Sequence, residues 1–222
     1  MMTIAAFCTL AGVLFIGADN PEPRQWNFEA ATVGALPKNW TATKTGEGPG
    51  SVWKILEDES APKGPKVLAQ TSPDGPDSMF NLCVADDTSY ADVDLSVAMK
   101  PREGKNDQGG GLVWRYKDAK NYYVCRMNPL EDNFRVYKVV DGKRSMFKSA
   151  AVNAPAGKWH TIRIVQKGDQ IQCYLNGKEY LDVKDDTLKD AGKIGLWTKA
   201  YAVTSFDELV VKPLSSAAEA GK

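Results

Sequence analysis

Few residues in this chain combine the types and spacing that chemistry needs. His160 is the only histidine, so multi-histidine metal sites are excluded and any nucleophilic triad would depend on it. Its strand parity with Ile162 and Ile164 predicts an inward-facing structural histidine instead. Carboxylates occur in adjacent pairs such as Glu131-Asp132, and the two side chains of such a pair point away from each other. No Glu-x-Asp-x-x-Glu run directs several carboxylates into one cleft, as retaining glycosidases do. Glu131 and Asp132 remain the catalytic candidates because they follow an arginine-bearing segment.

Arg126 is more informative, because it lies in the middle of a predicted strand, residues 121–128 (NYYVCRMN). Alternation places one set of side chains on the core face, namely Tyr123, Cys125 and Met127, and leaves Tyr122, Val124, Arg126 and Asn128 on the other face. A guanidinium can bind vicinal hydroxyls or a carboxylate through two hydrogen bonds, and tyrosine can stack on a sugar ring.

A second strand, KIGLWTK over residues 193–199, shows the same division. Ile194 and Leu196 share one face, so Trp197 and Lys199 lie on the opposite one. We predict a single concave binding site made of Arg115, Tyr122, Arg126, Asn128, Trp197 and Lys199. The alternative is an ordinary solvated sheet face with cross-strand pairs.

A structural calcium ion is one interpretation of two further carboxylates. Asp207 has the parity of the apolar Leu209 and Val211, so its carboxylate needs a partner inside the fold. Glu29 lies on the predicted first strand, and oxygen ligands suit calcium. A hydrogen bond from Asp207 to the backbone is the alternative. No cofactor is required for the predicted function.

Length and charge limit the classes of partner. The chain has 222 residues, enough for one large all-β domain, and 28 basic residues balance 28 acidic ones. This balance argues against nucleic-acid or anionic-membrane partners. Residues 1–18 resemble a secretory signal peptide, with an uncleaved anchor as the alternative. We expect a secreted or periplasmic protein, with no membrane contact after cleavage, one domain over 19–213 and a disordered tail over 214–222.

Cysteine usage argues against a disulfide scaffold. After cleavage, Cys83, Cys125 and Cys173 would remain, which is an odd number. Cys125 and Cys173 alternate in phase with apolar neighbours and are interpreted as small core residues. A bridge between these two is the alternative.

Strand and turn signals recur along the chain, and no long segment has helical periodicity. Residues 109–116, 121–128 and 134–140 form a predicted meander, followed by an Asp141-Gly142 hairpin turn. Residues 159–166 and 171–175 form another predicted pair, followed by Asn176-Gly177. Two antiparallel sheets packed face to face, in an all-β jelly-roll sandwich, bury such strands most simply.

Several motifs resemble the concanavalin A-like sandwich superfamily, specifically its laminin-G-like and 3-keto-disaccharide hydrolase domains. They are Trp159-His160, the NGK at 176–178, and the GLWTK-to-FDEL ending, within a similarity that covers residues 26–212. The resemblance implies exported proteins that bind or process glycans, with the keto-sugar enzymes acting on 3-keto-glycosides. Where those domains tend to carry a Glu-x-Gln-x-x-Asp strand, residues 122–128 carry no carboxylate.

The leading hypothesis is therefore a module that binds a carbohydrate or glycoside on one concave sheet face. The enzymatic alternative is a 3-keto-glycoside hydrolase or lyase, in which Glu131 or Asp132 takes the proton at C2 and a cation stabilises the enolate. A protein-interaction module is the third hypothesis, and it would show a broader apolar patch.

Overall fold

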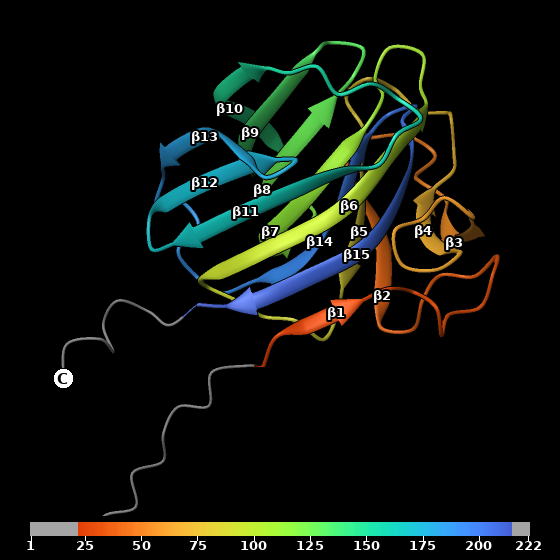
Figure 1. The fold of residues 1–222 in the computed structure, drawn as a ribbon. Coiled ribbons are helices and arrows are strands. Elements are labelled where there is room, and N and C mark those ends of the chain that lie inside the picture. The colour runs from red at the N-terminus through yellow and green to blue at the C-terminus, as the bar shows by residue number, and fades with distance from the viewer. Residues whose placement is uncertain (1–21, 215–222) are drawn as a thin grey trace, which may run out of the picture.

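Two antiparallel β-sheets packed face to face form the protein (Figure 1). The computed structural model describes residues 22–214, and every strand lies between Arg24 and Pro213. The predicted jelly-roll sandwich is confirmed. Within this range, no helix has the length and apolarity to cross a membrane. The predicted leader and residues 215–222 of the predicted tail lie outside the described residues.

The larger sheet has eight strands and is the flatter layer of the sandwich. Its strand order is β13 (Lys178–Lys184), β12 (Gln170–Leu175), β11 (His160–Lys167), β6 (Val93–Glu103), β15 (Val203–Pro213), β4 (Lys66–Gln70) and β3 (Trp53–Glu57), and β1 (Arg24–Trp26) also pairs with β15. The first and last strands of the chain thus lie side by side.

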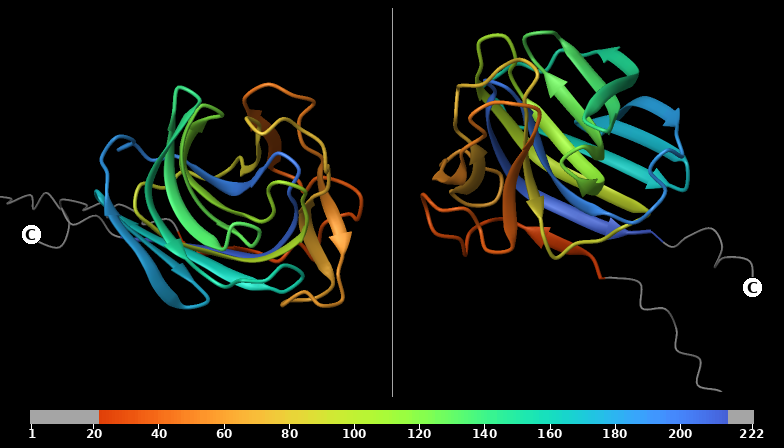
Figure 2. Two further views of the ribbon diagram at one scale, coloured as in Figure 1. Left: turned by 90° about the horizontal axis from the view of Figure 1, so that it is seen from above. Right: turned by 180° about the vertical axis from the view of Figure 1, so that it is seen from behind.

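The smaller sheet has seven strands and is strongly curved. Its strand order is β10 (Lys143–Ala151), β9 (Asn133–Val140), β8 (Asn121–Asn128), β7 (Gly110–Asp118), β14 (Lys193–Lys199), β5 (Phe80–Ala85) and β2 (Trp40–Thr45). The view from above in Figure 2 shows its green strands bending into an arc, and we call the inner side of this arc the hollow. The face of this sheet that points away from the larger sheet is therefore concave.

Turn chemistry sets the register of the hairpins at the site. Asp141 and Gly142 both have positive φ angles, 50° and 77°, which is the pattern of a type I′ turn. This turn pairs Val140 with Lys143 and Val139 with Arg144. The predicted meander and its turn are confirmed.

Both faces of the smaller sheet carry buried apolar side chains. The main core lies between the sheets and includes Tyr123, Cys125, Met127, Ile194 and Leu196, as alternation predicted. A second buried cluster lies on the concave face and comprises Phe80, Leu82, Val84, Val113, Tyr122, Val124, Tyr137, Val139 and Trp197. An antiparallel sheet commonly has one solvated face. Here the concave face also carries a packed apolar layer.

Glycines in β7 allow the neighbouring strands to approach closely. A Cβ atom on Gly110 would lie 2.4 Å from the Trp197 carbonyl oxygen, and one on Gly111 would overlap the Cys125 carbonyl oxygen. The glycine run 109–111 therefore serves packing, as the sequence indicated, and forms the floor of the concave face.

A buried hydrogen bond links the two sheets. The Trp114 indole nitrogen donates to Gln166 Oε1 at 2.9 Å, and both side chains are fully buried. The Gln166 amide also donates to the Gly168 carbonyl at 2.7 Å. We expect Gln166→Met to lower the free energy of unfolding by about 1–3 kcal/mol, because it leaves a buried indole N–H without an acceptor. Urea unfolding measures the change.

The matched control is Gln172→Met, because Gln172 lies on β12 and donates to Glu179 at the surface. Its effect should stay within about 0.5 kcal/mol. Equal effects of the two substitutions would mean that the inter-sheet hydrogen bond does not stabilise the fold.

Candidate functional site

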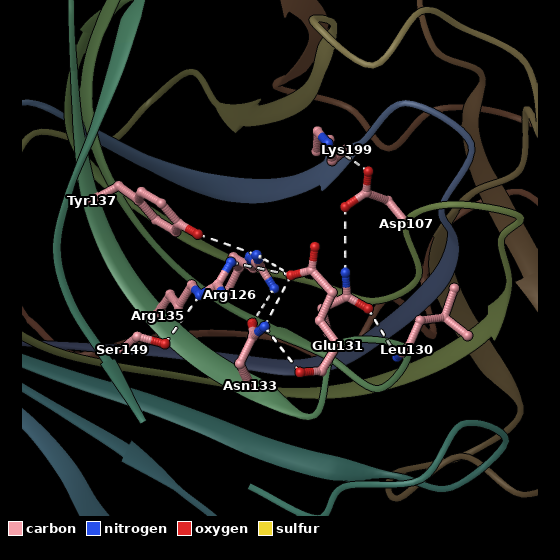
Figure 3. Close-up of polar contacts among 10 residues, drawn as sticks. Asp107, Arg126, Leu130, Glu131, Asn133, Arg135, Tyr137, Ser149 and Lys199 are labelled. Atoms are coloured by element: carbon pink, nitrogen blue, oxygen red, sulfur yellow. Dashed lines mark hydrogen bonds and ion pairs between the residues drawn. The ribbon is translucent and has the colours of Figure 1, made fainter. Parts of the chain in front are cut away.

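The candidate site lies on the concave face of the smaller sheet, at the ends of β8, β9 and β14. Arg126 is at its centre and only 3% exposed. Its guanidinium donates to Asn133 Oδ1 at 2.6 Å, Glu131 Oε2 at 2.9 Å and the Tyr137 hydroxyl at 3.1 Å. Figure 3 shows these side chains converging from β9 and the β8–β9 turn. Arg126 is thus held in one orientation before any ligand arrives.

Glu131 is the acceptor that organises this network. Its Oε2 atom accepts from Arg126, from Asn133 at 2.9 Å and from Arg135 at 3.2 Å. Every hydrogen bond from residues 22–214 to this carboxylate ends on Oε2, so Oε1 remains free to accept a bond from a ligand (Figure 3). The glutamate presents one oxygen and is anchored by the other.

The same contacts make Glu131 strongly acidic. Burial alone would raise its pKa, but hydrogen bonds from Asn133 and Arg126, with the charges of Arg126 and Arg135, lower the pKa to about 2. A carboxylate with such a pKa stays ionised at neutral pH and is a poor proton acceptor. This arrangement suits recognition better than proton abstraction.

A second ion pair lies beside the first. Lys199 donates to Asp107 Oδ2 at 2.5 Å, and the Asn128 amide donates to Asp107 Oδ1 at 3.3 Å. Asn128 in turn accepts from the Leu130 backbone N–H at 3.0 Å, which holds the turn that carries Glu131. Figure 3 shows the Asp107 carboxylate directed at the Lys199 ammonium.

Between the two ion pairs is a small cavity of about 10 Å³, lined by Asp107, Arg126, Asn128, Trp197 and Lys199 among others. Its volume is that of a single water molecule and excludes a sugar ring. A carbohydrate would therefore have to bind above the network, on its exposed atoms.

The structure brings five of the six predicted ligand-binding residues to this face, the exception being Arg115. A β-bulge follows Trp114 in β7, and Arg115 has a φ of 45°, so its side chain leaves the predicted alternation. Its guanidinium instead donates to the carbonyls of Ala91, Leu188 and Gly168 and pairs with Asp92 at 3.1 Å. Arg115 thus joins loops at the other end of the strand.

Four of the five residues are on the predicted face but are 3% exposed or less, and only Lys199 is partly exposed. Trp197 is 1% exposed, and Tyr122 is fully buried with its hydroxyl 2.8 Å from Thr45 Oγ1. Burial raises the pKa of Tyr122, and the neighbouring Thr45 and Trp197 side chains partly oppose this shift. The indole N–H of Trp197 lies near the Tyr122 hydroxyl but forms no hydrogen bond. The rings of Trp197 and Tyr122 support the site from below, so a sugar does not stack directly on either ring in this arrangement.

Asp132, the other catalytic candidate, takes no part in the Arg126 network. It is exposed, with a φ of 48°, and its backbone carbonyl accepts from the Val152 N–H. It lines an open depression with residues 151–153.

His160 has the predicted structural role. It is 7% exposed, and its ring nitrogens contact the Pro155 carbonyl at 2.9 Å and the Asn176 amide at 3.1 Å. The three cysteines between residues 22 and 214, Cys83, Cys125 and Cys173, are buried and unbridged, which agrees with their interpretation as core residues.

The predicted calcium ligands lie together on the other side of the molecule. Asp207 is fully buried and accepts from the Lys63 and Glu208 backbone N–H groups at 3.0 and 2.7 Å. Glu29 accepts from the Lys66 N–H at 2.9 Å, and the Lys66 ammonium donates to the Glu29 and Ala31 carbonyls. Two carboxylates already bonded to the backbone, beside an ammonium, fit poorly with calcium, which takes about six to eight oxygens. Calcium here stays a prediction.

Sequence reasoning missed several members of the site. They are Asp107, Asn133, Arg135, Tyr137 and Arg144. The Asp141-Gly142 turn carried a usable signal, because its two-residue hairpin pairs Val139 with Arg144 and Tyr137 with Met146. Asp107 follows β6 in a loop and carried none.

Comparison with known families identifies the fold's relatives. The family model of the 3-keto-alpha-glucoside-1,2-lyase-like domain matches residues 34–212. The chain belongs to this family. The match spans both sheets, so the lyase-like domain includes the whole concave site.

Several other proteins resemble this lyase-like domain. An extracellular exo-alpha-L-arabinofuranosidase from Streptomyces chartreusis is 29% identical over 103 residues, which is 46% of this chain and 12% of that protein. The carbohydrate-binding module CBM66 from Bacillus subtilis superposes with a TM-score of 0.61 at 20% identity, over 77% of this chain and 93% of the module. A beta-glucanase from Bacillus licheniformis gives 0.57 at 14% identity, over 88% and 99%. The two structures establish the concanavalin A-like jelly-roll fold.

The buried carboxyl of Asp207 should make stability depend on pH. Burial raises its pKa from 3.8 to about 6; the backbone N–H groups of Glu208 and Lys63 oppose this, and the charges of Glu208 and Glu29 add to it. A raised folded-state pKa stabilises the fold fully below about pH 4, and this stabilisation is lost as the pH rises through about 6. Between pH 4 and neutral pH, Asp207 should thus lower the free energy of unfolding by about 2–3 kcal/mol. Asp207→Asn should therefore gain stability over the parent protein between pH 4.5 and 7.5, measured by urea unfolding.

A constant difference between the two proteins across this range would contradict the pKa assignment. Repeating the titration with millimolar Ca²⁺ and with a chelator tests the calcium prediction. A bound divalent cation would stabilise the Asp207 carboxylate, so only a site that holds calcium would lose its pH dependence when Ca²⁺ is added.

Proposed function

We propose that this domain binds carbohydrate on the concave face of the smaller sheet. The observation that carries the proposal is the fixed pair formed by Arg126 and Glu131. Arg126 is oriented by three hydrogen bonds, and Glu131 keeps Oε1 free. A donor and an acceptor held side by side suit the vicinal hydroxyls of a sugar, because their geometry is set before binding.

The surroundings support the same function. Lys199 and Asn128 extend the line of polar groups along the hollow through their bonds to Asp107. The family and the fold relatives include proteins named for carbohydrate binding or cleavage. A protein-interaction module is less well supported, since this face is charged where such a module would expose a broad apolar patch.

A second candidate function is cleavage of a 3-keto-glycoside, which family membership favours. In that reaction a base removes the proton at C2, Arg126 stabilises the enolate formed with the C3 ketone, and the C1–O bond then breaks. Glu131 is the carboxylate nearest to Arg126. Its pKa of about 2 makes it a poor base at neutral pH, so binding is the leading function.

Export to the cell exterior or periplasm is part of the proposal. It is supported by the apolar residues 1–18 and by a relative named as extracellular.

The binding proposal predicts that Arg126→Met weakens glycan affinity at least tenfold, because methionine keeps the packing against Tyr137 but removes the donors. Isothermal titration against oligosaccharides that bind the parent protein measures this. Arg163→Met is the matched control, since Arg163 also pairs with a carboxylate, Asp94, and stacks on Tyr174, but on the larger sheet. Equal affinities of both variants would remove Arg126 from the site.

The enzymatic candidate is tested with a 3-keto-disaccharide beside its unoxidised parent sugar, following loss of the keto sugar and ligand-induced thermal shift. We expect a thermal shift without turnover. Turnover of the keto sugar that disappears in Glu131→Gln would establish the lyase instead. Neither signal with any glycan would contradict both candidates.

A further inference from the structure

Arg144, on β10, lies over the aromatic floor of the concave face. Its guanidinium carbon is 4.6 Å from the Tyr137 ring centre, 4.7 Å from that of Phe80 and 5.8 Å from that of Trp197. Contact with three rings restricts the guanidinium to one place, and cation–π attraction adds to that restraint. Arg144 covers Trp197 and is the group that a ligand would meet there.

Arg144 has no counterion within residues 22–214, unlike the other cations of the site. Arg126 and Arg135 both pair with Glu131, and Lys199 pairs with Asp107. The Nη1 atom of Arg144 is buried without any hydrogen-bond acceptor. Buried donors are normally satisfied, so an unpaired guanidinium on a candidate binding face needs an explanation.

The local charge points the same way. The site holds the cations Arg126, Arg135, Arg144 and Lys199 but only two carboxylates, Glu131 and Asp107. The whole chain has no net charge, so the excess of positive charge is a local feature. Burial lowers the pKa of Arg144 and the charge of Arg126 acts in the same direction, while Tyr137 and the Asp107 carboxylate partly oppose the shift.

A second donor beside Arg144 is also unsatisfied. The indole Nε1 of Trp197 is buried without an acceptor. Trp197 is 1% exposed and its indole lies near the Tyr122 hydroxyl, so the acceptor that a ligand would supply is the one that Arg144 lacks. Arg144 as a whole is only partly buried, and Nη1 is the one nitrogen of its guanidinium that is both buried and without a partner.

We propose that the sugar recognised at this face is acidic, and that Arg144 binds the carboxylate of a uronic acid residue. The inference rests on the proposed carbohydrate-binding function and names its ligand class. A carboxylate brings two acceptor oxygens in a geometry that matches a planar guanidinium, together with the missing negative charge. Neutral hydroxyls would supply acceptors but leave the charge uncompensated.

The roles of the two arginines then differ. Arg126 shares the Tyr137 ring with Arg144, at 5.8 and 4.6 Å, but its charge is already balanced by Glu131. It is suited to hydroxyl groups, with Glu131 Oε1 as the neighbouring acceptor. Arg144 is suited to the charged substituent of the same or an adjacent sugar ring.

The test is isothermal titration of the purified protein against matched oligosaccharides: galacturonate and glucuronate oligomers, their methyl esters, and the corresponding neutral galactose and glucose oligomers. The ester keeps the size of the acidic sugar and removes its charge. We expect at least one acidic oligomer to bind tenfold or more tightly than its ester, with affinity that falls as NaCl is raised. Arg144→Gln should abolish this preference, and Arg144→Lys, which keeps the charge, should retain part of it.

Arg163→Gln is the control, because it removes a ring-stacked arginine from the larger sheet and should leave the preference unchanged. Equal binding of acid, ester and neutral oligomers would overturn the acidic ligand and leave carbohydrate binding intact. Tighter binding of sulfated than of carboxylated oligomers would also overturn it. Failure of every oligosaccharide to bind would overturn the proposed function itself and the inference with it.

Discussion

Side chains on both faces of β8 are buried, and the concave site depends on this constraint. Tyr123, Cys125 and Met127 pack between the sheets, while Tyr122 and Val124 pack in the hollow of the curved sheet. A residue on this strand can therefore carry charge only near the strand's end, where Arg126 reaches the partners that compensate its burial. The position of the polar network follows from the packing.

Glu131 accepts the hydrogen bonds that orient the polar network at the end of β8. One of its oxygens receives three donors, and these lower its pKa to about 2, while the other oxygen has no partner among residues 22–214. The same contacts that orient the carboxylate for recognition remove its basicity. This electrostatic trade-off is the reason why we propose binding ahead of proton transfer at a site within a family whose model is named for a lyase.

Balanced and unbalanced charges on the concave face have different physical consequences. Paired groups such as Lys199 and Asp107 are rigid and contribute geometry, whereas an unpaired Arg144 contributes an electrostatic preference. Because the aromatic rings below Arg144 are covered, the hollow presents guanidinium groups in place of a bare aromatic platform. The proposed preference for an acidic sugar therefore depends on these cations more than on stacking.

The sequence alone determined the strands of the meander, its hairpin turn and the face on which Tyr122, Arg126, Asn128, Trp197 and Lys199 lie, because a strand's alternation is local and has a period of two residues. It did not locate the strands β2 to β6 in the first half of the chain. It could not place Arg115, since a bulge interrupts that period and redirects the side chain. Only the tertiary structure brought Asp107 to Lys199 and Arg144 over Phe80 and Trp197, because these contacts join segments far apart in the chain. Burial of the aromatic rings likewise depends on the curvature of the whole sheet, which no single strand encodes.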